Sequence, residues 1–267
     1  MKIKFLGVGS AFTTADYYQS NILVTARSGR KMLIDCGSDI RFALRECGFR
    51  FRYFGREIDA IYISHLHADH IGGLEGVAFN TLFDGLSPRP KLFIAESLAQ
   101  ELWDHSLKGG LMCVQDREMD IDDYFICSPL VGNGSFEWEG ISFCLVKMLH
   151  TGAGCKHPYS FGLVATDETG SVFISTDAQF QPGLLDEIAG RVDLMFHDCE
   201  TMRAPSGIHA HYNDLRTLPL SLKQKMWLYH YQPNPTQNPN EEGFRGFVVK
   251  GQEFDFSSAA AEHDFID

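Results

Sequence analysis

Three histidines and one aspartate lie within six consecutive residues, 65–70, which read HLHADH and follow the apolar run IYIS. If that run is a buried strand, the two-residue spacing places His65 and His67 on the same side of the extended chain, where both can bind one metal ion. Asp69 and His70, in the turn that follows, would bind a second ion. Imidazole and carboxylate ligands suit Zn²⁺, with Mn²⁺ or Fe²⁺ also possible. The sequence therefore predicts a metal site here.

The pattern HxHxDH after a strand, followed by Gly72-Gly73, resembles the metallo-β-lactamase superfamily. The opening residues 3–11 resemble the first strand and glycine turn of that superfamily, and residues 32–37 resemble its strand that ends in an Asp-x-Gly turn. The resemblance covers residues 1 to about 250. It implies an α/β fold, the four-layer αββα sandwich of two mixed sheets, which we expect to form a single hydrolase domain of residues 1–267.

Two-metal members of this superfamily have three further ligands, each at the end of a strand. The resemblance assigns these roles to His150, Asp177 and His230, each of which follows a strand-like apolar run. The carboxylate of Asp177 would bridge two ions about 3.5–4 Å apart. The predicted ligands of two Zn²⁺ (or Mn²⁺) ions per subunit are therefore His65, His67, Asp69, His70, His150, Asp177 and His230.

The composition limits the class of protein. The chain has 267 residues, of which 44% are hydrophobic, and a mean hydropathy of −0.14, so it can bury a large core. It contains neither an apolar run of about 18 residues nor a basic-then-apolar leader, and we expect no membrane association. The seven cysteines are scattered without CxxC pairs, which is typical of free thiols in a reducing compartment. We expect a cytoplasmic protein.

Apolar runs and turn residues predict strands interleaved with helices, which fits two mixed sheets packed face to face with helices outside. The predicted strands are 2–8, 20–26, 31–35, 59–64, 91–95, 141–149, 159–166, 171–176, 192–197, 226–229 and 244–250. The predicted helices are 38–47, 72–84, 96–107, 181–189 and 211–218.

The segment around residues 195–216 resembles the region of ribonuclease Z-like phosphodiesterases in which an acidic residue orients a histidine that protonates the leaving alcohol. Such an acid is needed because an alkoxide is a poor leaving group. The His-x-x-Tyr-x-x-Leu spacing makes His209 our choice for this acid and His211 the alternative. The orienting partner would be His197 or Asp198.

Two residues beside the predicted ligands could take part in other ways. Asp69 lies next to the expected position of the bridging water, so it could also accept the proton of that water. Thr151 follows the ligand His150 and could donate a hydrogen bond to the ligand shell.

The net charge of −12 favours a small anionic substrate over an extended nucleic acid, because proteins that bind long polyanions usually present many Lys and Arg side chains. Transfer-RNA processing enzymes of this group carry a long arm between the equivalents of His150 and Asp177. Here two predicted strands and a turn fill that interval. The closer resemblance is to the small-substrate branch, which contains cyclic-nucleotide phosphodiesterases, cyclic phosphate phosphodiesterases and anti-Pycsar proteins.

We therefore expect a dinuclear-metal phosphodiesterase that hydrolyses a small phosphodiester, most simply a cyclic nucleotide, by attack of a metal-bridged hydroxide. The alternatives are a ribonuclease Z-like tRNA 3′ endonuclease, a lactonase or thioesterase on the same scaffold, and a protein that sequesters a nucleotide without hydrolysing it. Members of the branch are commonly dimers, so we also expect a homodimer.

The segment FRFRYF, residues 49–54, alternates aromatic and cationic side chains. It could stack a base and hold a phosphate. The preferred interpretation is an edge hairpin with its aromatic side chains inward and its arginines in solvent.

Overall fold

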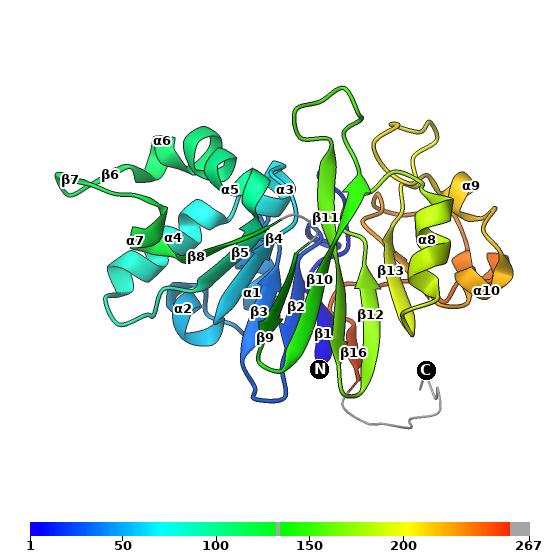
Figure 1. Ribbon diagram of the computed structural model, residues 1–267, viewed down its shortest axis with the longest axis horizontal. Coiled ribbons are helices and arrows are strands. Elements are labelled where there is room, and N and C mark those ends of the chain that lie inside the picture. Colours follow the sequence, from blue (N-terminus) through cyan, green and yellow to red (C-terminus); the bar gives the residue numbers. More distant parts are fainter. Residues whose placement is uncertain (132–133, 257–267) are drawn as a thin grey trace.

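The structure is a computed structural model that describes residues 1–131 and 134–256. Two seven-stranded mixed sheets pack against each other, and helices cover the outer face of each sheet (Figure 1). The predicted αββα sandwich is thus confirmed. Figure 1 shows α2, α4, α5 and α7 on one side of the sheets and α8, α9 and α10 on the other.

The strands of each sheet are given in their spatial order. The first sheet contains β16 (Glu253–Asp255), β1 (Lys2–Phe5), β2 (Ile22–Thr25), β3 (Lys31–Ile34), β4 (Ala60–Ile63), β5 (Lys91–Ala95) and β8 (Ile126–Leu130). The second contains β15 (Gly246–Phe247), β14 (Met226–Tyr229), β13 (Leu194–Asp198), β12 (Gly170–Ile174), β11 (Tyr159–Asp167), β10 (Ile141–Leu149) and β9 (Ser135–Trp138). A separate ribbon pairs β6 (Cys113–Val114) with β7 (Arg117–Glu118).

The helices are mostly short. The α-helices are α1 (Ile40–Glu46), α2 (Phe54–Glu57), α3 (Ala68–Ile71), α4 (Leu74–Asp84), α5 (Glu96–Leu102), α6 (Lys108–Leu111), α7 (Ile121–Tyr124), α8 (Pro182–Ala189), α9 (Tyr212–Leu215) and α10 (Leu220–Lys223). Two 3₁₀ turns, η1 (Phe51–Tyr53) and η3 (Pro239–Glu242), and a π turn, η2 (Trp103–Leu107), complete the set. None of the helices in the described part of the chain has the length and apolar character that crossing a bilayer demands.

Both sheets change from antiparallel to parallel pairing partway across. Strands β3, β4, β5 and β8 are parallel to one another, and so are β12, β13, β14 and β15. In open α/β sheets, ligands bind beyond the carboxyl ends of parallel strands. The topology therefore points to the carboxyl ends of β3, β4, β12, β13 and β14 as the place for a site.

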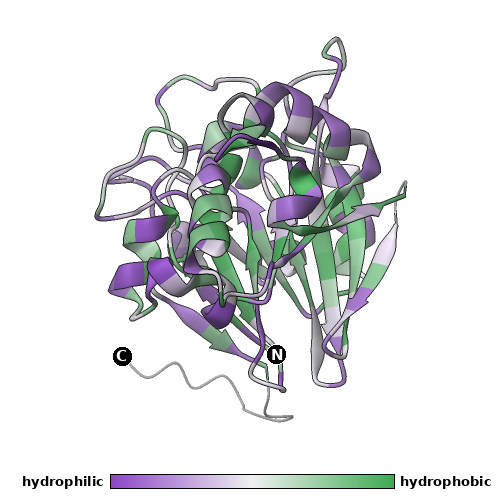
Figure 2. Ribbon diagram, turned by 90° about the vertical axis from the view of Figure 1, so that its left-hand side faces the viewer, coloured by the Kyte–Doolittle hydropathy of each residue, from purple (hydrophilic) through white to green (hydrophobic). Residues whose placement is uncertain are grey.

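Aromatic side chains between the two sheets hold them together. The ring of Phe5 on β1 lies 5.0 Å from that of Phe196 on β13 and 5.3 Å from that of Tyr229 on β14. The hydroxyl of Tyr62 on β4 donates a hydrogen bond to the carbonyl of Phe161 on β11 (2.7 Å). Figure 2 shows mostly apolar residues along the strands, whereas the outer helices carry both apolar and hydrophilic residues. This packing fixes the position of one sheet relative to the other.

Most predicted elements are present, with shorter ends. The predicted strand at 244–250 is only Gly246–Phe247, and the predicted helix at 211–218 is only Tyr212–Leu215. After Leu215 the N–H groups of Thr217 and Leu218 donate to carbonyls only three residues back, and Pro219 disfavours a helical conformation at Leu218, so the helix does not continue. Strand β8 was missed because Pro129 and polar residues interrupt its pattern; as an edge strand it tolerates the proline. Strands β9 and β16 were also missed.

The predicted edge hairpin at residues 49–54 is wrong. The segment forms η1 and the start of α2. The rings of Phe51 and Phe54 pack edge to face, 6.0 Å apart, in the apolar layer beneath these turns. Spacing of three residues places both rings on one side of a helical turn, which an alternating hairpin would not do.

Candidate metal centre

The structure brings the seven predicted ligands together beyond the carboxyl ends of the strands. His65 and His67 follow β4, and Asp69 and His70 lie on the short helix α3. His150 follows β10, and the remaining ligands, Asp177 and His230, follow β12 and β14. All seven side chains except that of His67, which is half-buried, are buried.

Four of these side chains form a first group. Nε2 of His65 lies 3.0 Å from Nδ1 of His67, and Nε2 of His150 lies 3.1 Å from the same nitrogen. Oδ2 of Asp177 is 3.7 Å from Nε2 of both His65 and His150. Four donor atoms within 4.8 Å of one another can bind one metal ion.

The second group uses the other oxygen of the same carboxylate. Oδ1 of Asp177 lies 3.2 Å from Nε2 of His70 and 3.2 Å from Nε2 of His230. Oδ2 of Asp69 lies 3.2 Å and 3.4 Å from these two nitrogens. Asp177 thus belongs to both groups through different oxygens, which is the arrangement expected of a bridging carboxylate.

The chemistry of these donors fits metal ions. Among the described residues, Nε2 of His70 and Oδ1 of Asp177 are buried without a hydrogen-bond partner. Burial alone would raise the pKa of Asp177, but His230 and His70 beside it hold that pKa well below its usual range. Burial also keeps the pKa of His65 well below its usual range, so its imidazole stays neutral, which is the form that binds metal. For His70 and His230 burial alone would lower the pKa, but Asp177 beside them outweighs this effect and raises it, so these two rings would release a proton to a bound ion. Carboxylate oxygens and imidazole nitrogens facing one another form a donor set for divalent ions.

Asp35, at the end of β3, orients two ligands. Its Oδ2 accepts a hydrogen bond from Nδ1 of His70 (2.7 Å) and from the Ser64 hydroxyl (2.7 Å), and that hydroxyl lies 3.0 Å from Nδ1 of His65. Fixing the second ring nitrogen sets the tautomer and direction of a metal-binding histidine. Sequence reasoning placed Asp35 in an Asp-x-Gly turn without giving it this role. The Asp-x-Gly turn could have indicated this role, because it ends β3, and β3 runs parallel to β4, which leads into the ligands His65 and His67.

Substitution of Asp35 tests this support. Besides the two hydrogen bonds on Oδ2, Asp35 accepts the backbone N–H of Ser64 on Oδ1 (2.8 Å). We expect Asp35→Asn to weaken zinc binding about 10- to 100-fold, because an amide has one accepting oxygen and an NH₂ group, and so cannot accept on both sides as the carboxylate does. Competition with a chromophoric chelator measures the affinity. Asp59→Asn is the matched control, since Asp59 also accepts a backbone N–H (from Lys31, 2.8 Å) but lies at the opposite end of the sheet. Equal affinities in the two variants would contradict the assignment.

Three residues at these strand ends have a left-handed backbone. The φ angles are 62° for Asp35, 54° for Thr176 and 63° for His230. Residues with a Cβ adopt this conformation only at a cost of about 1–3 kcal/mol, and such residues concentrate at functional sites. The turns after β3, β12 and β14 therefore aim their side chains at one point at the expense of local stability.

Asp198, at the end of β13, connects a further histidine to the second group. Its Oδ2 accepts a hydrogen bond from Nδ1 of His209 (2.7 Å), and its Oδ1 lies 3.3 Å from Nδ1 of His230. The ring of His209 lies about equally far from those of His150 (5.1 Å) and His230 (5.0 Å), between the two groups. Burial alone would lower the pKa of His209, but Asp198 outweighs this effect and raises it. His209 therefore tends to carry a proton at the centre.

The other predicted residues of this region lie outside the centre. Nδ1 of His211 accepts the backbone N–H of Asn213, and its Nε2 donates to the carbonyl of Met202, so both ring nitrogens have partners. Nδ1 of His197 donates to the carbonyl of Asp198 instead of to its side chain. The hydroxyl of Thr151 donates to the carbonyl of His157 (3.0 Å) instead of to a ligand side chain. The geometry therefore favours His209 over His211 as the general acid, and Asp198 over His197 as the residue that orients it.

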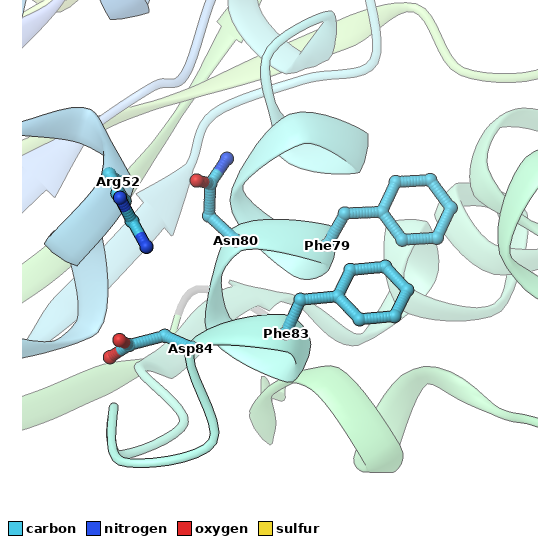
Figure 3. Close-up of a pocket in the computed structure, with 5 residues that line it drawn as sticks. All are labelled: Arg52, Phe79, Asn80, Phe83 and Asp84. Atoms are coloured by element: carbon cyan, nitrogen blue, oxygen red, sulfur yellow. The ribbon is translucent and has the colours of Figure 1, made fainter.

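Arg52, from the FRFRYF segment, lies in a separate surface pocket of about 320 Å³ (Figure 3). The pocket is formed with Phe79, Asn80, Phe83 and Asp84 of α4, which lie near the carboxyl end of that helix. Helix α4 begins just after the ligands and rises about 1.5 Å per residue, so most of its length separates this pocket from the metal centre. The pocket is therefore not part of that centre.

Comparison with known proteins identifies the family. The sequence model of the family described as "Anti-Pycsar protein Apyc1" matches residues 1–254. The chain belongs to this family. An anti-Pycsar protein Apyc1 of Paenibacillus harenae is 38% identical over 250 residues, which cover 93% of this chain and 97% of that protein. One from Bacillus phage vB_BveM-Goe7 is 35% identical over 261 residues, covering 94% and 97%.

Solved structures similar to this Apyc1 family member share its fold. The metallo-β-lactamase fold protein YhfI from Bacillus subtilis aligns with a TM-score of 0.72 and 16% identity, over 95% of this chain and 98% of its own. The short form of human tRNase Z aligns with a TM-score of 0.68 and 16% identity, over 97% and 100%. A diphosphatase of the PhnP family aligns with a TM-score of 0.70 and 20% identity, over 95% and 97%.

The family and the metal-binding groups together confirm the predicted enzyme class. The chain is a metal-dependent hydrolase with the metallo-β-lactamase fold, of the phosphodiesterase type.

Proposed function

We propose that this Apyc1 family member hydrolyses a cyclic nucleotide at a centre of two Zn²⁺ ions, with Mn²⁺ as the alternative metal. The observation that supports this most directly is the position of His209, which lies between two metal-binding groups that share the carboxylate of Asp177. Hydrolysis of a phosphodiester with an alkoxide leaving group by two metal ions requires two metal-binding groups and one proton donor. The relatives support the substrate class, because anti-Pycsar proteins degrade cyclic nucleotides.

The ligands of the two ions would be the two groups described above. When bound, the ions would supply positive charge that offsets the charge on the phosphate, and they would make water a stronger nucleophile at neutral pH.

The protein's own residues carry the protons. In our proposal, water attacks phosphorus in line with the leaving oxygen, and Asp69 accepts the proton that the water loses. The bond between phosphorus and the leaving oxygen breaks, and Nε2 of His209 gives its proton to that oxygen. Asp198 keeps His209 in place, because its Oδ2 holds the Nδ1–H of the ring and so leaves Nε2 toward the centre. The product is a nucleoside monophosphate in which one sugar hydroxyl has been newly released.

The experiment that tests this function is hydrolysis of a panel of 2′,3′- and 3′,5′-cyclic mononucleotides by zinc- or manganese-loaded protein, followed by chromatography. A pre-tRNA is assayed beside the panel. We expect turnover of cyclic mononucleotides and little cleavage of the tRNA. Cleavage of the tRNA alone would overturn the substrate class, and activity only on lactones or thioesters would overturn the reaction type.

A tRNA 3′ endonuclease is the second candidate, and the segment between His150 and Asp177 argues against it. This interval holds β11, β12, their short turn and one loop, residues 151–158. A chain that grips a tRNA with an arm at this position would need a long insertion there. The net charge of −12 adds to this argument, since a long polyanion is repelled by an acidic surface.

We also propose that the enzyme works as a homodimer in the cytoplasm. All seven cysteines are free, which suits a reducing compartment. Strand β8 lies at an edge of the first sheet, and Ile126 on it and Val131 just after it are exposed, so this edge offers apolar surface to a second copy of the chain. Light scattering should give a mass of about 60 kDa, twice the 30.0 kDa of one chain. A mass of one chain at micromolar concentration would contradict the dimer.

A further inference from the structure

Phe12 is almost fully exposed. Its relative exposure is 97%, the highest of any large hydrophobic residue in the described part of the chain, and the next highest is 79% for Leu86. Other exposed aromatic residues, such as Phe83 at 60%, keep part of their surface covered. The ring of Phe12 therefore offers both of its faces to solvent.

The loop that carries Phe12 is tightly closed. The N–H of Gly9 donates to the carbonyl of Tyr18 (2.8 Å), and the N–H of Tyr18 donates to the carbonyl of Thr14 (2.8 Å). The side chain of Thr13 folds over Gly9 so closely that a Cβ there would lie 2.0 Å from its hydroxyl oxygen. The exposure of Phe12 is thus imposed by an ordered backbone.

This loop borders the metal centre. The N–H of Ser10 donates to the carbonyl of Tyr231, the residue after the ligand His230, and the N–H of His230 itself donates to the carbonyl of Val8. On the other side, the side chain of Gln19 donates to the carbonyl of Ala11 (3.3 Å).

Gln19 also links the loop to the ligand turn. A Cβ built on Gly37 would lie 2.6 Å from Oε1 of Gln19 and 2.2 Å from the carbonyl oxygen of Asp69. The backbone before Phe12 is therefore hydrogen-bonded to His230, and Gln19, which binds the loop at Ala11, packs with the backbone of Asp69 against Gly37.

We propose that Phe12 stacks on the nucleobase of the substrate while the phosphodiester lies at the metal centre. This inference rests on the proposed function, which it deepens by assigning a base-binding residue. An aromatic ring with open faces stacks on any base, since every base has a π-face. The other exposed aromatic ring near a ligand, Tyr159, fits less well, because the ammonium group of Lys147 lies over it at 5.8 Å.

A substrate without a base distinguishes base stacking by Phe12 from hydrolysis of the phosphodiester. Methyl ribofuranoside 3′,5′-cyclic phosphate keeps the phosphodiester ring and the sugar but has a methoxy group in place of the base. We expect Phe12→Ala to lower kcat/KM for 3′,5′-cyclic mononucleotides about 5- to 100-fold, mainly through KM, because stacking contributes about that factor per base. The base-free substrate should be hydrolysed by Phe12→Ala as fast as by the unaltered enzyme.

Phe12→Tyr and Phe83→Ala are the controls. Phe12→Tyr keeps an aromatic ring and should restore most of the nucleotide turnover. Phe83→Ala removes an exposed ring at the pocket of Figure 3 and should leave kcat/KM unchanged for both substrates. Equal losses on both substrates, or a Phe12→Ala variant whose mass by light scattering differs from the unaltered protein, would overturn the proposal, since the ring would then serve the fold or a subunit contact.

Fluorescence of Phe12→Trp reads binding without catalysis. The three native tryptophans, Trp103, Trp138 and Trp227, are buried, so the new indole is the exposed one. Stacking should quench its emission when a cyclic mononucleotide phosphorothioate is added, and the base-free phosphodiester should leave the emission unchanged. An unchanged emission with both would overturn the base site. Because this measurement needs no turnover, it decides the inference even if the enzyme hydrolyses neither substrate, a result that would instead refute the proposed function.

Discussion

Asp177→Ala should lose both metal ions and nearly all activity. One oxygen of this carboxylate belongs to each metal-binding group, so a single substitution removes a ligand from both. We expect bound zinc to fall from two ions per chain to fewer than one, and kcat/KM for a cyclic nucleotide to fall by more than about 10³-fold, because charge stabilisation of the transition state is lost with the ions. Metal analysis after dialysis and a turnover assay measure the two effects.

The control for this variant is Asp193→Ala. Asp193 lies at the amino end of β13 and accepts hydrogen bonds from Ser171, at the opposite end of the sheet from Asp177. It should keep two ions and full activity. Retention of two ions by Asp177→Ala would show that the carboxylate does not bridge them.

His209→Ala should keep both ions, and its loss of activity should depend on the substrate: a large loss where the leaving group needs a proton and a small loss where it does not. Loss of a general acid costs about 10²- to 10⁴-fold where the leaving oxygen is a ribose alkoxide. The p-nitrophenolate released from bis-(p-nitrophenyl) phosphate leaves without a proton, so that substrate should lose far less. The ratio of the two activities therefore reports proton donation, while metal analysis shows that the centre is intact.

His211→Ala is the comparison for this experiment. His211 lies two residues away and caps α9, with both ring nitrogens bound to backbone groups. Its loss should lower both activities together or neither. A His209→Ala variant with the same loss on both substrates would show that His209 positions groups and does not donate the proton.

The positions at which the predicted ligands gather were predictable because apolar runs of strand length precede HLHADH, His150, Asp177 and His230. HLHADH comes after β4, and the spacing of His65 and His67 needs no tertiary information. His150, Asp177 and His230 were assigned through the order of strand ends that the superfamily shares. The strands Lys91–Ala95, Ile141–Leu149 and Met226–Tyr229 have the predicted bounds, since their apolar runs end at polar or turn residues.

The residues around the ligands were less predictable. Neighbouring residues in a strand point to opposite faces, so the pair His197–Asp198 gives two answers until the face toward the centre is known. Only the fold shows that Asp198 faces His209. His211 has the same chemistry as His209, and its role as a helix cap depends on where α9 begins. Phe12 follows no pattern that distinguishes an exposed ring from a buried one.

Each metal-binding group draws on both sheets. His65 and His67 come from the first sheet and meet His150 and Asp177 from the second, while Asp69 and His70 meet His230. During synthesis the first group is complete once Asp177 has left the ribosome, but the second must wait for His230. In the proposed two-ion centre the nascent chain would therefore load one ion before the other, and each ion would add a link between two sheets that side-chain packing and hydrogen bonds such as that from Tyr62 to Phe161 already connect. Removal of the ions by a chelator should for this reason weaken the contacts between the two sheets before it unfolds either sheet.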